Sequence, residues 1–396
     1  MTTLGIFTVK RFVCDHGRYY TYGGFGDYLA EIRKYFSRVV LVAHVKSGKK
    51  PEGWYEVPAV GLEVVHLPAI PTELGQIVSL PVMLVKSLTA VRRMDVVHAR
   101  MPDYTGVFGA LAARLFGKPV FCQTVGDWRE LAATIPLTKT FGLGLPLRAH
   151  MLLYDRAERW VARGQLMFAQ GEKSYAKHAR SSDCHLILST AHYLADVVPP
   201  TPKFLHRPYT ILNVGRMQLE KNQSLLIRAL ARLNAAEPGQ WRLVIVGVGT
   251  HREALAELAR KLDVGAWVSF PGQFAHGDAL WRQYDDADVF ALSSINEGTP
   301  KVLLEAMARG LPVVASAVGG VPTAVAHEER GLLFPSGDVE ALGAALRRMR
   351  DDRALRERCQ RQGNAFAREQ TLEISTRSMI ETVGRRWPFL RFEAAP

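Results

Sequence analysis

Short apolar runs alternate with longer stretches of helical spacing along the first half of the chain. The runs predict strands at residues 4–9, 39–43, 63–67, 96–99, 120–124 and 166–169. The spacing predicts helices at residues 26–36, 80–94, 106–116 and 148–163. Because strands separated by helices are typical of βαβ units, we expect a parallel sheet covered by helices.

A proline-rich segment at residues 196–208 interrupts this alternation, because prolines at such density prevent a helix or a central strand. The alternation then resumes, with strands predicted at residues 210–214, 242–246, 268–271, 289–292, 313–315 and 332–334. Helices are predicted at residues 223–233, 252–262, 300–308, 339–350 and 371–387. We therefore interpret the proline-rich segment as a linker between two α/β domains.

The predicted fold class is α/β, with two Rossmann-like doubly wound domains that face a cleft. A chain of 396 residues is too long for one ordinary core. We expect a first domain over 1–198 and a second over 209–374, with a C-terminal helix at about 375–396 that packs back on the first. In such sheets ligands bind where the carboxyl ends of strands meet helix N-termini.

Charge distinguishes the first half of the chain. The net charge is +12, and residues 1–198 hold 24 Lys and Arg against 16 Asp and Glu. This excess fits a plain basic protein, and it also fits an anionic substrate, an anionic lipid surface or nucleic acid. No helix-turn-helix, zinc-finger or RNA-recognition motif accompanies the charge, so we predict no nucleic-acid partner.

Targeting and cysteine patterns predict a reducing compartment. No secretory signal is recognisable, and no apolar run reaches the ~18–20 residues of a membrane span. The four cysteines are widely scattered, which argues against a zinc site and against a disulfide framework. We expect a cytoplasmic monomer or homodimer, either free or peripheral on the inner membrane face.

The most informative segment runs from residue 293 to 305, directly after a predicted strand. Thr299 and Pro300 suit the N-cap and the first residue of a helix, and Gly298 lets a ligand approach the backbone. The helix start offers amides to an anion. An anion would also relieve the conflict between Lys301 and the positive end of the helix dipole.

Glu297 and Glu305 of this segment are expected to lie about 8–10 Å apart, at a rise of ~1.5 Å per residue. This separation is too large for two carboxylates to share a proton, and it suits the gripping of different hydroxyls on one extended ligand. The alternative is a helix cap and a solvated glutamate.

Cations and glycines follow two other predicted strands. Arg216 can bind a phosphate in bidentate fashion, and Lys221 adds a second positive charge, although both could be plain surface cations. Gly247 and Gly249 form a Gly-x-Gly, a weak signal that we expect to shape a strand-to-helix turn rather than to bind a dinucleotide.

Two further segments, both in the first half, could contact ligands. The Gly-Gly pair at residues 23–24 could bring backbone amides to a phosphate or a sugar, or form a flexible turn. The stretch 143–160 mixes apolar residues with arginines, listed as Leu145, Leu147, Met151, Leu152, Trp160, Arg148, Arg156 and Arg159. This composition suits a helix on anionic lipid, and equally a buried helix with one solvated face.

Taken together, these motifs resemble the retaining GT-B glycosyltransferases of family 4, the glycogen-synthase-like type. The matching pieces are the early Gly-Gly, the Gly-Arg-x4-Lys stretch, the Glu-x7-Glu pair headed by Glu-Gly-x-Pro, and residues 286–290, 319–322 and 331–334. The resemblance is dense over 209–345 and looser over 1–195. It implies transfer of a hexose-type sugar from a nucleotide diphosphate sugar, UDP- rather than GDP-linked, without metal or other cofactor.

The resemblance also implies roles for individual residues. Arg216 and Lys221 would hold the donor diphosphate, Glu305 the ribose and Glu297 the transferred sugar. The implied donor-binding set is Gly23, Gly24, Gly215, Arg216, Lys221, Gly247, Glu297, Gly298, Thr299, Pro300, Lys301, Val302 and Glu305. Two cations and a helix N-terminus can replace a metal, and we expect the Asp-Ala-Asp at 286–288 to be structural because it precedes an apolar strand.

The sequence departs from this family at one position, since Val125 stands where a histidine near the reacting sugar is often found. Asp127 and His98 are therefore the candidates for acceptor orientation or proton handling. Front-face attack, in which the departing phosphate oxygen takes the acceptor proton, would need no protein base. The predicted catalytic set is Glu297, Arg216, Lys221, Asp127 and His98.

We expect the acceptor, a carbohydrate or a lipid- or phosphate-linked one, at a loop between the first strand and the Gly-Gly pair. Cations suit phosphates and aromatic faces pack on sugars. The predicted acceptor-binding set is Arg11, Arg18, Tyr20 and Asp127, and an ordinary surface loop is the alternative.

Other functions remain as alternatives to transfer. Nucleotide-sugar epimerisation or hydrolysis uses the same fold, but it needs several acidic and basic groups around the sugar. A dinucleotide-dependent oxidoreductase would need a third glycine after Gly247 and Gly249. A non-catalytic basic protein would leave the Arg216, Lys221, Glu297 and Glu305 set unexplained.

Overall fold

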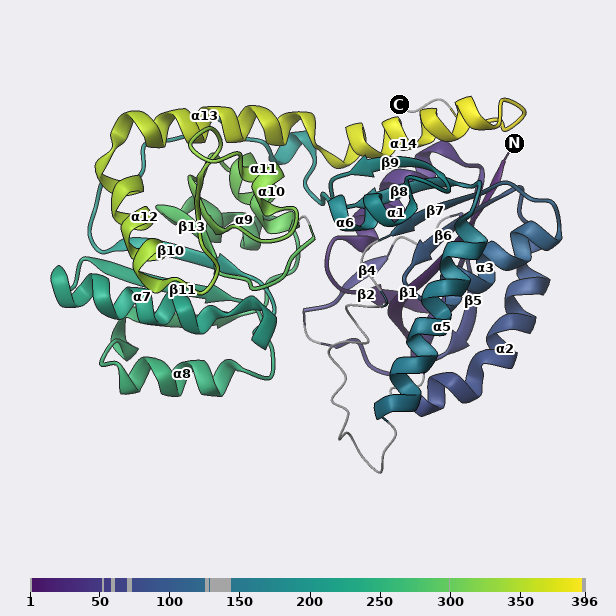
Figure 1. Ribbon diagram of the computed structural model, residues 1–396, viewed down its shortest axis with the longest axis horizontal. Coiled ribbons are helices and arrows are strands. Elements are labelled where there is room, and N and C mark those ends of the chain that lie inside the picture. The colour runs from purple at the N-terminus through teal and green to yellow at the C-terminus, as the bar shows by residue number, and fades with distance from the viewer. Residues whose placement is uncertain are drawn as a thin grey trace. The chain divides into compact units, whose positions relative to one another are not determined.

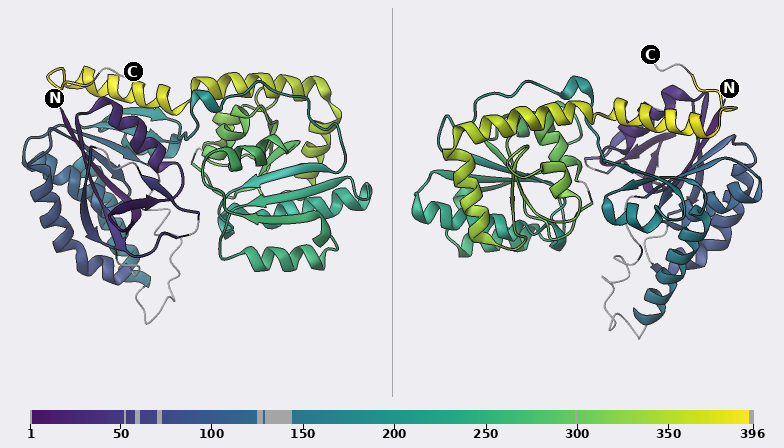
Figure 2. Two further views of the ribbon diagram at one scale, coloured as in Figure 1. Left: turned by 180° about the vertical axis from the view of Figure 1, so that it is seen from behind. Right: turned by 45° about the horizontal axis from the view of Figure 1, so that its top comes forward.

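The computed structural model describes residues 2–51, 53–57, 61–69, 73–124, 128, 144–298 and 300–393. The chain divides into two compact units (Figures 1 and 2). Unit 1 consists of Met1–Leu188 with Ser375–Pro396, and unit 2 of Ser189–Ile374.

A mostly parallel sheet forms the centre of unit 1. Its parallel strands are β1 (Thr3–Asp15), β3 (Arg38–Ser47), β5 (Leu62–Pro68), β6 (Val96–Met101), β7 (Val120–Thr124), β8 (Leu166–Gln170) and β9 (Asp183–Ile187). The spatial order is β5-β3-β1-β6-β7-β8-β9. All five residues of β7 are buried, as expected for a parallel strand covered on both faces.

The segment expected to be an acceptor loop is instead a β-hairpin. β1 continues beyond its pairing with β6, and its last residues pair antiparallel with β2 (Arg18–Thr21). β2 in turn pairs antiparallel with β4 (Tyr55–Val57). The prediction of a loop was wrong because residues 18–21 pair with β1 and also with β4, a strand from a separate segment, and local patterning does not reveal the second pairing.

Helices cover this sheet. They are α1 (Phe25–Ile32), α2 (Glu73–Val91), α3 (Tyr104–Leu115), α5 (Gly144–Ala162), α6 (Glu172–His178) and α14 (Leu372–Arg386). Asp103 caps α3, because its carboxylate accepts a hydrogen bond from the Thr105 amide at 2.9 Å. α2 begins at Glu73, seven residues before the predicted start, and continues through Pro81.

The C-terminal segment packs on unit 1. The hydroxyl of Thr2 donates to the carbonyl of Arg391 at 2.7 Å, and the amide of Glu393 donates to the carbonyl of Tyr35 at 3.0 Å. The rings of Phe36 and Phe392 meet edge to face at 5.5 Å.

Unit 2 contains a wholly parallel sheet in the order β12-β11-β10-β13-β14-β15. Its strands are β10 (Tyr209–Val214), β11 (Trp241–Val246), β12 (Val268–Gly272), β13 (Val289–Leu292), β14 (Val313–Ser316) and β15 (Leu332–Phe334). Its helices are α7 (Gln223–Ala236), α8 (Arg252–Lys261), α9 (Asp278–Asp285), α10 (Lys301–Ala308), α11 (Val321–Val325), α12 (Val339–Asp351) and α13 (Arg353–Glu369). Aliphatic side chains around the buried Trp241 form its core.

The proline-rich segment packs on α13, a helix that the sequence did not predict. The amide groups of Gln360 and Asn364 donate to the carbonyls of Thr201 and Val198 at 3.0 and 2.9 Å. The buried side of α13 consists of Leu355, Cys359, Gln360, Gly363, Asn364 and Ala367, and its two polar members are satisfied by hydrogen bonds. Because Leu355 is the only large aliphatic residue on this side, the sequence pattern does not mark the helix clearly. The helices α6, α9 and α11 and the strand β9 were also missed.

Candidate functional site

Two loops meet at the carboxyl edge of the sheet in unit 2. Lys221 follows β10 and Glu297 follows β13, and the Nζ of Lys221 lies 2.5 Å from Oε1 of Glu297. The hydroxyl of Ser294 donates to the same carboxylate oxygen at 2.7 Å. Backbone contacts also join the loops, since the amide of Ile295 donates to the carbonyl of Glu220 at 2.9 Å. The two segments predicted to act together are therefore in direct contact.

The guanidinium of Arg216 lies in the same loop as Lys221 and reaches solvent. Its side chain is 66% exposed, and its ion pair with Glu220 is long, at 3.7 Å. The backbone of Arg216 is fixed, because its carbonyl accepts a hydrogen bond from Gln223 at 2.9 Å. A fixed backbone with an extended cation is suited to capture an anion.

Glycines allow close packing around this loop. Gly247 has φ +136°, and a Cβ there would clash with the carbonyl of Gly215. A Cβ at Gly249 would clash with Met217. The amide of Met217 donates to the carbonyl of Val248 at 2.9 Å. Because both glycines of the Gly-x-Gly pack against the loop of Arg216, they shape the turn after β11.

A second glycine turn supports the loop of Glu297. Gly319 has φ +53°, and a Cβ there would clash with the carbonyl of Glu297. The amide of Gly320 donates to the carbonyl of Gly298 at 3.0 Å. At Gly215 and Gly298, in contrast, an added Cβ would meet no atom within 4 Å. The backbone is therefore held on one side and open at the two glycines where a ligand could approach.

Helix α10 begins at this loop, one residue later than predicted. Pro300 is its N-cap rather than its first helical residue, and no side chain caps the helix. Thr299, the predicted cap, lies outside the described residues. Lys301 and Val302 form the first turn, which carries no acidic residue. An uncapped N-terminus of this kind favours an anionic group.

Glu305 faces inward from α10 and is only 5% exposed. Its Oε2 accepts a hydrogen bond from the hydroxyl of Tyr284 at 2.7 Å. Burial, together with the charge of Glu305, raises the pKa of Tyr284 well above its usual value, so this phenol stays a donor. Tyr284 was not predicted, because it belongs to the missed helix α9.

The Asp-Ala-Asp segment binds backbone. The two carboxylate oxygens of Asp288 accept hydrogen bonds from the amides of Phe204 and Thr210 at 2.6 and 2.7 Å. The carboxylate thereby fixes the end of the linker to the start of β10.

The Gly-Gly turn of unit 1 is held by Tyr55 of β4. The Tyr55 hydroxyl donates to the carbonyl of Gly23 and accepts a hydrogen bond from the amide of Gly26 at 2.9 Å. Gly23 has φ +64°, and Gly24 is the N-cap of α1. Because a Cβ at Gly23 would meet no atom within 4 Å, the turn is open on that side.

Three of the four predicted acceptor residues, Arg11, Arg18 and Tyr20, lie on the hairpin. Arg11 is exposed, and Arg18 makes a long contact of 3.5 Å with Glu56. Tyr20 lies under the Nζ of Lys50 at 5.5 Å. Cations and aromatic rings thus share this extension of the sheet.

Of the two candidates for proton handling, His98 lies in the part of the chain that the structure describes. Asp127 and Val125 lie outside the described residues. His98 is fully buried on β6, stacked on Phe121 at 4.5 Å with Nδ1 3.0 Å from the Tyr28 hydroxyl. Burial and the nearby Arg100 lower the pKa of His98 well below its usual value. These surroundings favour a packing role for His98.

Two parallel-sheet Rossmann-like units define the GT-B architecture, and the chain has this fold. It is similar to Anabaena HepE in complex with UDP, with a TM-score of 0.70, 18% identity and coverage of 97% and 100% of the two chains. It is also similar to sucrose-phosphate synthase from Thermosynechococcus elongatus, with a TM-score of 0.74, 18% identity and coverage of 98% and 100%.

The family comparisons agree with this architecture. Residues 200–366 match the family "Glycosyl transferases group 1", and residues 23–166 match "Glycosyl transferase 4-like domain". The first match lies within unit 2 and the second within unit 1, and each covers less than half of the chain.

Two curated relatives are similar over part of their length. Sulfoquinovosyl transferase SQD2 of Arabidopsis thaliana is 28% identical over 360 residues, which are 84% of this chain and 64% of the relative. D-inositol 3-phosphate glycosyltransferase of Kineococcus radiotolerans is 37% identical over 200 residues, 44% of this chain and 46% of the relative. The match therefore spans less than two thirds of either relative.

Proposed function

We propose that the chain is a retaining glycosyltransferase that moves a hexose-type sugar from a nucleotide diphosphate sugar to a carbohydrate or a lipid- or phosphate-linked acceptor. Unit 2 would bind the donor and unit 1 the acceptor, in the cytoplasm. The observation that carries this proposal is the contact between Lys221 and Glu297 beside the exposed Arg216 and the uncapped start of α10.

In this proposal the cations bind the diphosphate. Arg216 and Lys221 supply two positive charges, and the first amides of α10 at Lys301 and Val302 add hydrogen-bond donors. The same groups stabilise the negative charge that develops on the leaving nucleoside diphosphate. They can do so without a divalent metal, and metal independence is part of the proposal.

The carboxylates bind hydroxyl groups. Glu297 would accept a hydrogen bond from a hydroxyl of the transferred sugar. Glu305, which Tyr284 orients, would accept hydrogen bonds from the ribose hydroxyls. An oriented carboxylate distinguishes a ligand with a hydroxyl from one without it, because a buried acceptor left unpaired costs ~1–3 kcal/mol.

Retention is proposed to occur by front-face attack. The glycosidic bond to the diphosphate breaks, the acceptor hydroxyl forms the new bond on the same face, and the departing phosphate oxygen takes its proton. No side-chain base is then needed, which agrees with the burial of His98. Asp127 is proposed to orient the acceptor, and Arg11, Arg18 and Tyr20 are proposed to bind it as well.

UDP is the proposed nucleotide. The similar HepE chain was crystallised with UDP and with UDP-glucose. The test is thermal unfolding with UDP, GDP, ADP and NAD in the presence of EDTA. A ligand at 100 times its Kd adds ~2.7 kcal/mol of stability, so a UDP-specific rise in Tm is expected, and Arg216→Ala or Glu305→Ala should abolish it. The proposal would be contradicted if only NAD raised Tm. It would also be contradicted if none of the four nucleotides raised the Tm of a folded sample.

The alternative is an epimerase or hydrolase that acts on the same donor. The two are distinguished by incubation with UDP-sugars with and without acceptor. Release of UDP that depends on acceptor supports transfer, whereas release or sugar conversion without acceptor supports the alternative.

A further inference from the structure

The outer side of α2, α3 and α5 in unit 1 carries an unusual set of exposed apolar side chains. Seven of the 17 large apolar side chains exposed in the described residues lie on these three helices, which is too concentrated for ordinary surface scatter. They are Val78, Val82, Val85, Leu115, Leu152, Leu153 and Trp160. Neighbouring helices of the three pack together along one side of the sheet (Figures 1 and 2).

On α2 the exposed residues form one stripe. Val78, Val82 and Val85 are spaced by four and three residues, so they lie on one helix face. Val78 is 73% exposed and Val85 60% exposed, whereas Met83 and Ser87 of the same helix are buried toward the sheet. The solvent side of this stretch is therefore the apolar one, the reverse of an ordinary surface helix.

On α5 the outer face combines apolar residues with arginines. Leu153 is 59% and Trp160 57% exposed, and Arg156 and Arg163 lie exposed on the same side. Leu152 precedes Leu153 there. A tryptophan and leucines between arginines are typical of a helix that lies at a membrane interface.

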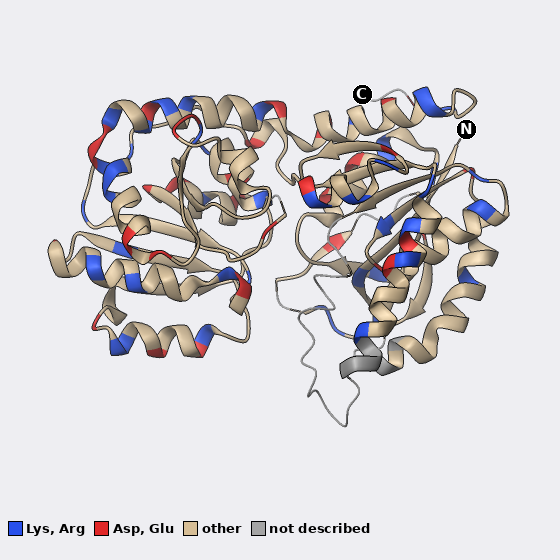
Figure 3. Ribbon diagram, viewed as in Figure 1, with Lys and Arg blue, Asp and Glu red and all other residues tan. Residues whose placement is uncertain are grey.

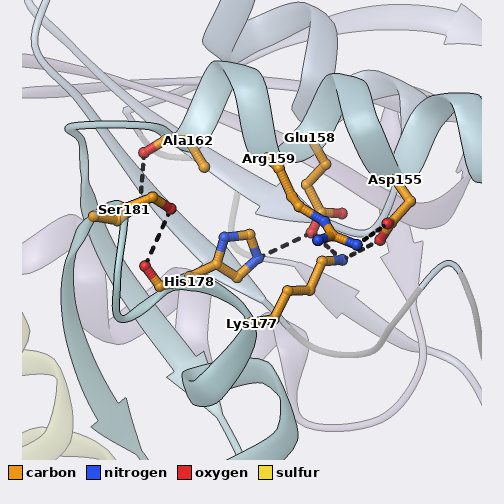
Figure 4. Close-up of polar contacts among 8 residues, drawn as sticks. Asp155, Glu158, Arg159, Ala162, Lys177, His178 and Ser181 are labelled. Atoms are coloured by element: carbon orange, nitrogen blue, oxygen red, sulfur yellow. Dashed lines mark hydrogen bonds and ion pairs between the residues drawn. The ribbon is translucent and has the colours of Figure 1, made fainter.

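The two acids of α5 face inward and are paired (Figure 4). Asp155 and Glu158 are buried, and the Nζ of Lys177 on α6 contacts them at 2.7 and 2.8 Å. Arg159 also contacts Asp155, at 2.5 Å, and His178 contacts Glu158, at 3.2 Å. The acids that would offset the outer arginines are thus neutralised inside the unit (Figure 3 marks the charges along the helices).

Arginines also join the C-terminal ends of the three helices. The guanidinium of Arg92 lies over the ring of Phe116 at 5.1 Å, and that of Arg114 over the ring of Trp160 at 5.2 Å. Arg114 also donates to the carbonyl of Arg163 at 2.9 Å. These contacts join the C-terminal ends of the three helices, where Leu115 and Trp160 are also exposed.

We propose that this face binds the surface of an anionic lipid bilayer. The apolar side chains would enter the headgroup–acyl boundary, and the arginines would contact lipid phosphates. Charge decides between this occupant and a second copy of the chain. A self-complementary contact would place arginines of two copies against each other, since the side chains described on α2, α3 and α5 include no exposed acid to pair with them. The proposal does not depend on sugar transfer.

The test is co-sedimentation of the full chain with vesicles of phosphatidylcholine alone or mixed with phosphatidylglycerol. We expect sedimentation only with the anionic vesicles, and a loss of binding as salt is raised. Each cation near the surface contributes ~1 kcal/mol, so Arg156→Gln and Arg163→Gln should each lower the partition coefficient about five-fold.

The apolar contribution has its own variants and controls. Val85→Gln and Leu153→Gln should weaken vesicle binding without changing the thermal midpoint, because both side chains are already exposed. Arg377→Gln and Phe389→Gln are matched controls, since both residues are exposed elsewhere on unit 1, and they should bind like the parent chain.

Three results would overturn the proposal. They are equal sedimentation with both vesicle types, binding that the four variants leave unchanged, and a dimer in analytical ultracentrifugation that Leu153→Gln dissociates. The last result would assign the face to a second copy. Nucleotide-induced stabilisation, measured on the same variants, reports on unit 2 separately, so failure of this inference and failure of the proposed function give different outcomes.

Discussion

The carboxylate of Glu297 accepts hydrogen bonds from both Lys221 and Ser294, which places the loops after β10 and β13 in one charged contact. These strands are neighbours in the sheet, although the two residues are 76 positions apart. An anion that draws Lys221 away would therefore also release Glu297 for a second group of the ligand. Donor binding is expected to couple these two residues.

This coupling predicts different effects of two substitutions. Lys221→Met should weaken UDP binding about 10- to 100-fold, because a hydrogen bond to a charged group contributes ~1.5–3 kcal/mol. Glu297→Gln frees Lys221 from its ion pair, so it should not weaken UDP binding, and it should lower kcat with the UDP-sugar. Isothermal titration and initial rates measure the two effects. Arg353→Met, which removes an exposed pair with Glu357, is the control and should change neither quantity.

Tyr284→Phe should destabilise unit 2 and weaken nucleotide binding. The buried carboxylate of Glu305 loses a donor, at a cost of ~1.5–3 kcal/mol. Urea unfolding and UDP titration at neutral pH measure both losses. Unchanged UDP affinity in a measurably destabilised variant would contradict a ribose-binding role for Glu305.

The raised pKa of Tyr284 also predicts how the stability of the protein changes at alkaline pH. The pKa of Tyr284 is raised in the folded protein, so above about pH 10 the unfolded chain loses this proton while the folded chain keeps it. The free energy of unfolding should then fall with rising pH, by up to ~1.4 kcal/mol per unit for this group. Tyr284→Phe should reduce that slope by one proton in urea titrations between pH 9 and 11.

The lowered pKa of His98 predicts that the free energy of unfolding depends on pH in the opposite direction under acidic conditions. Its folded pKa is lowered by burial, so below its ordinary value of about 6.5 the unfolded chain binds a proton that the folded chain does not. Stability should therefore fall as pH drops through this range, and less steeply in His98→Gln. Glycosyl transfer by the folded variant should persist if His98 only packs. Loss of kcat without loss of stability would restore its catalytic candidacy.

Gly319→Ala tests the turn that supports Glu297. A left-handed φ costs an alanine ~1–2 kcal/mol, and the clash with the Glu297 carbonyl should in addition displace the donor loop. Gly117→Ala is the matched control, since Gly117 has φ +62° with open space around it. Both variants should lose stability, and only Gly319→Ala should lose affinity for UDP.

The sequence predicted those parts of the fold that depend on local patterning. The strands β7, β13 and β15 match their predicted limits, because β13 and β15 are short, fully apolar runs and β7 begins with three apolar residues. The loops of Lys221 and Glu297 could be expected to meet because both follow strands of one parallel sheet, and their role in donor binding stays a prediction. Tyr284, Ser294 and Gly319 were not assigned roles, since their significance comes from contacts between distant segments. The hairpin was missed because β2 pairs with β4, a strand from another segment. α13 was missed because its buried side contains Gln360 and Asn364 and only one large aliphatic residue, Leu355.

The C-terminal helix has a consequence for biosynthesis. Unit 2 is one continuous stretch of chain, whereas unit 1 needs residues from both sides of it. All residues of unit 2 are therefore synthesised before Arg391 and Glu393, which bind Thr2 and Tyr35 of unit 1. Unit 1 begins first during translation but is completed last. Its apolar surface around Phe36 stays uncovered until Phe392 has been synthesised.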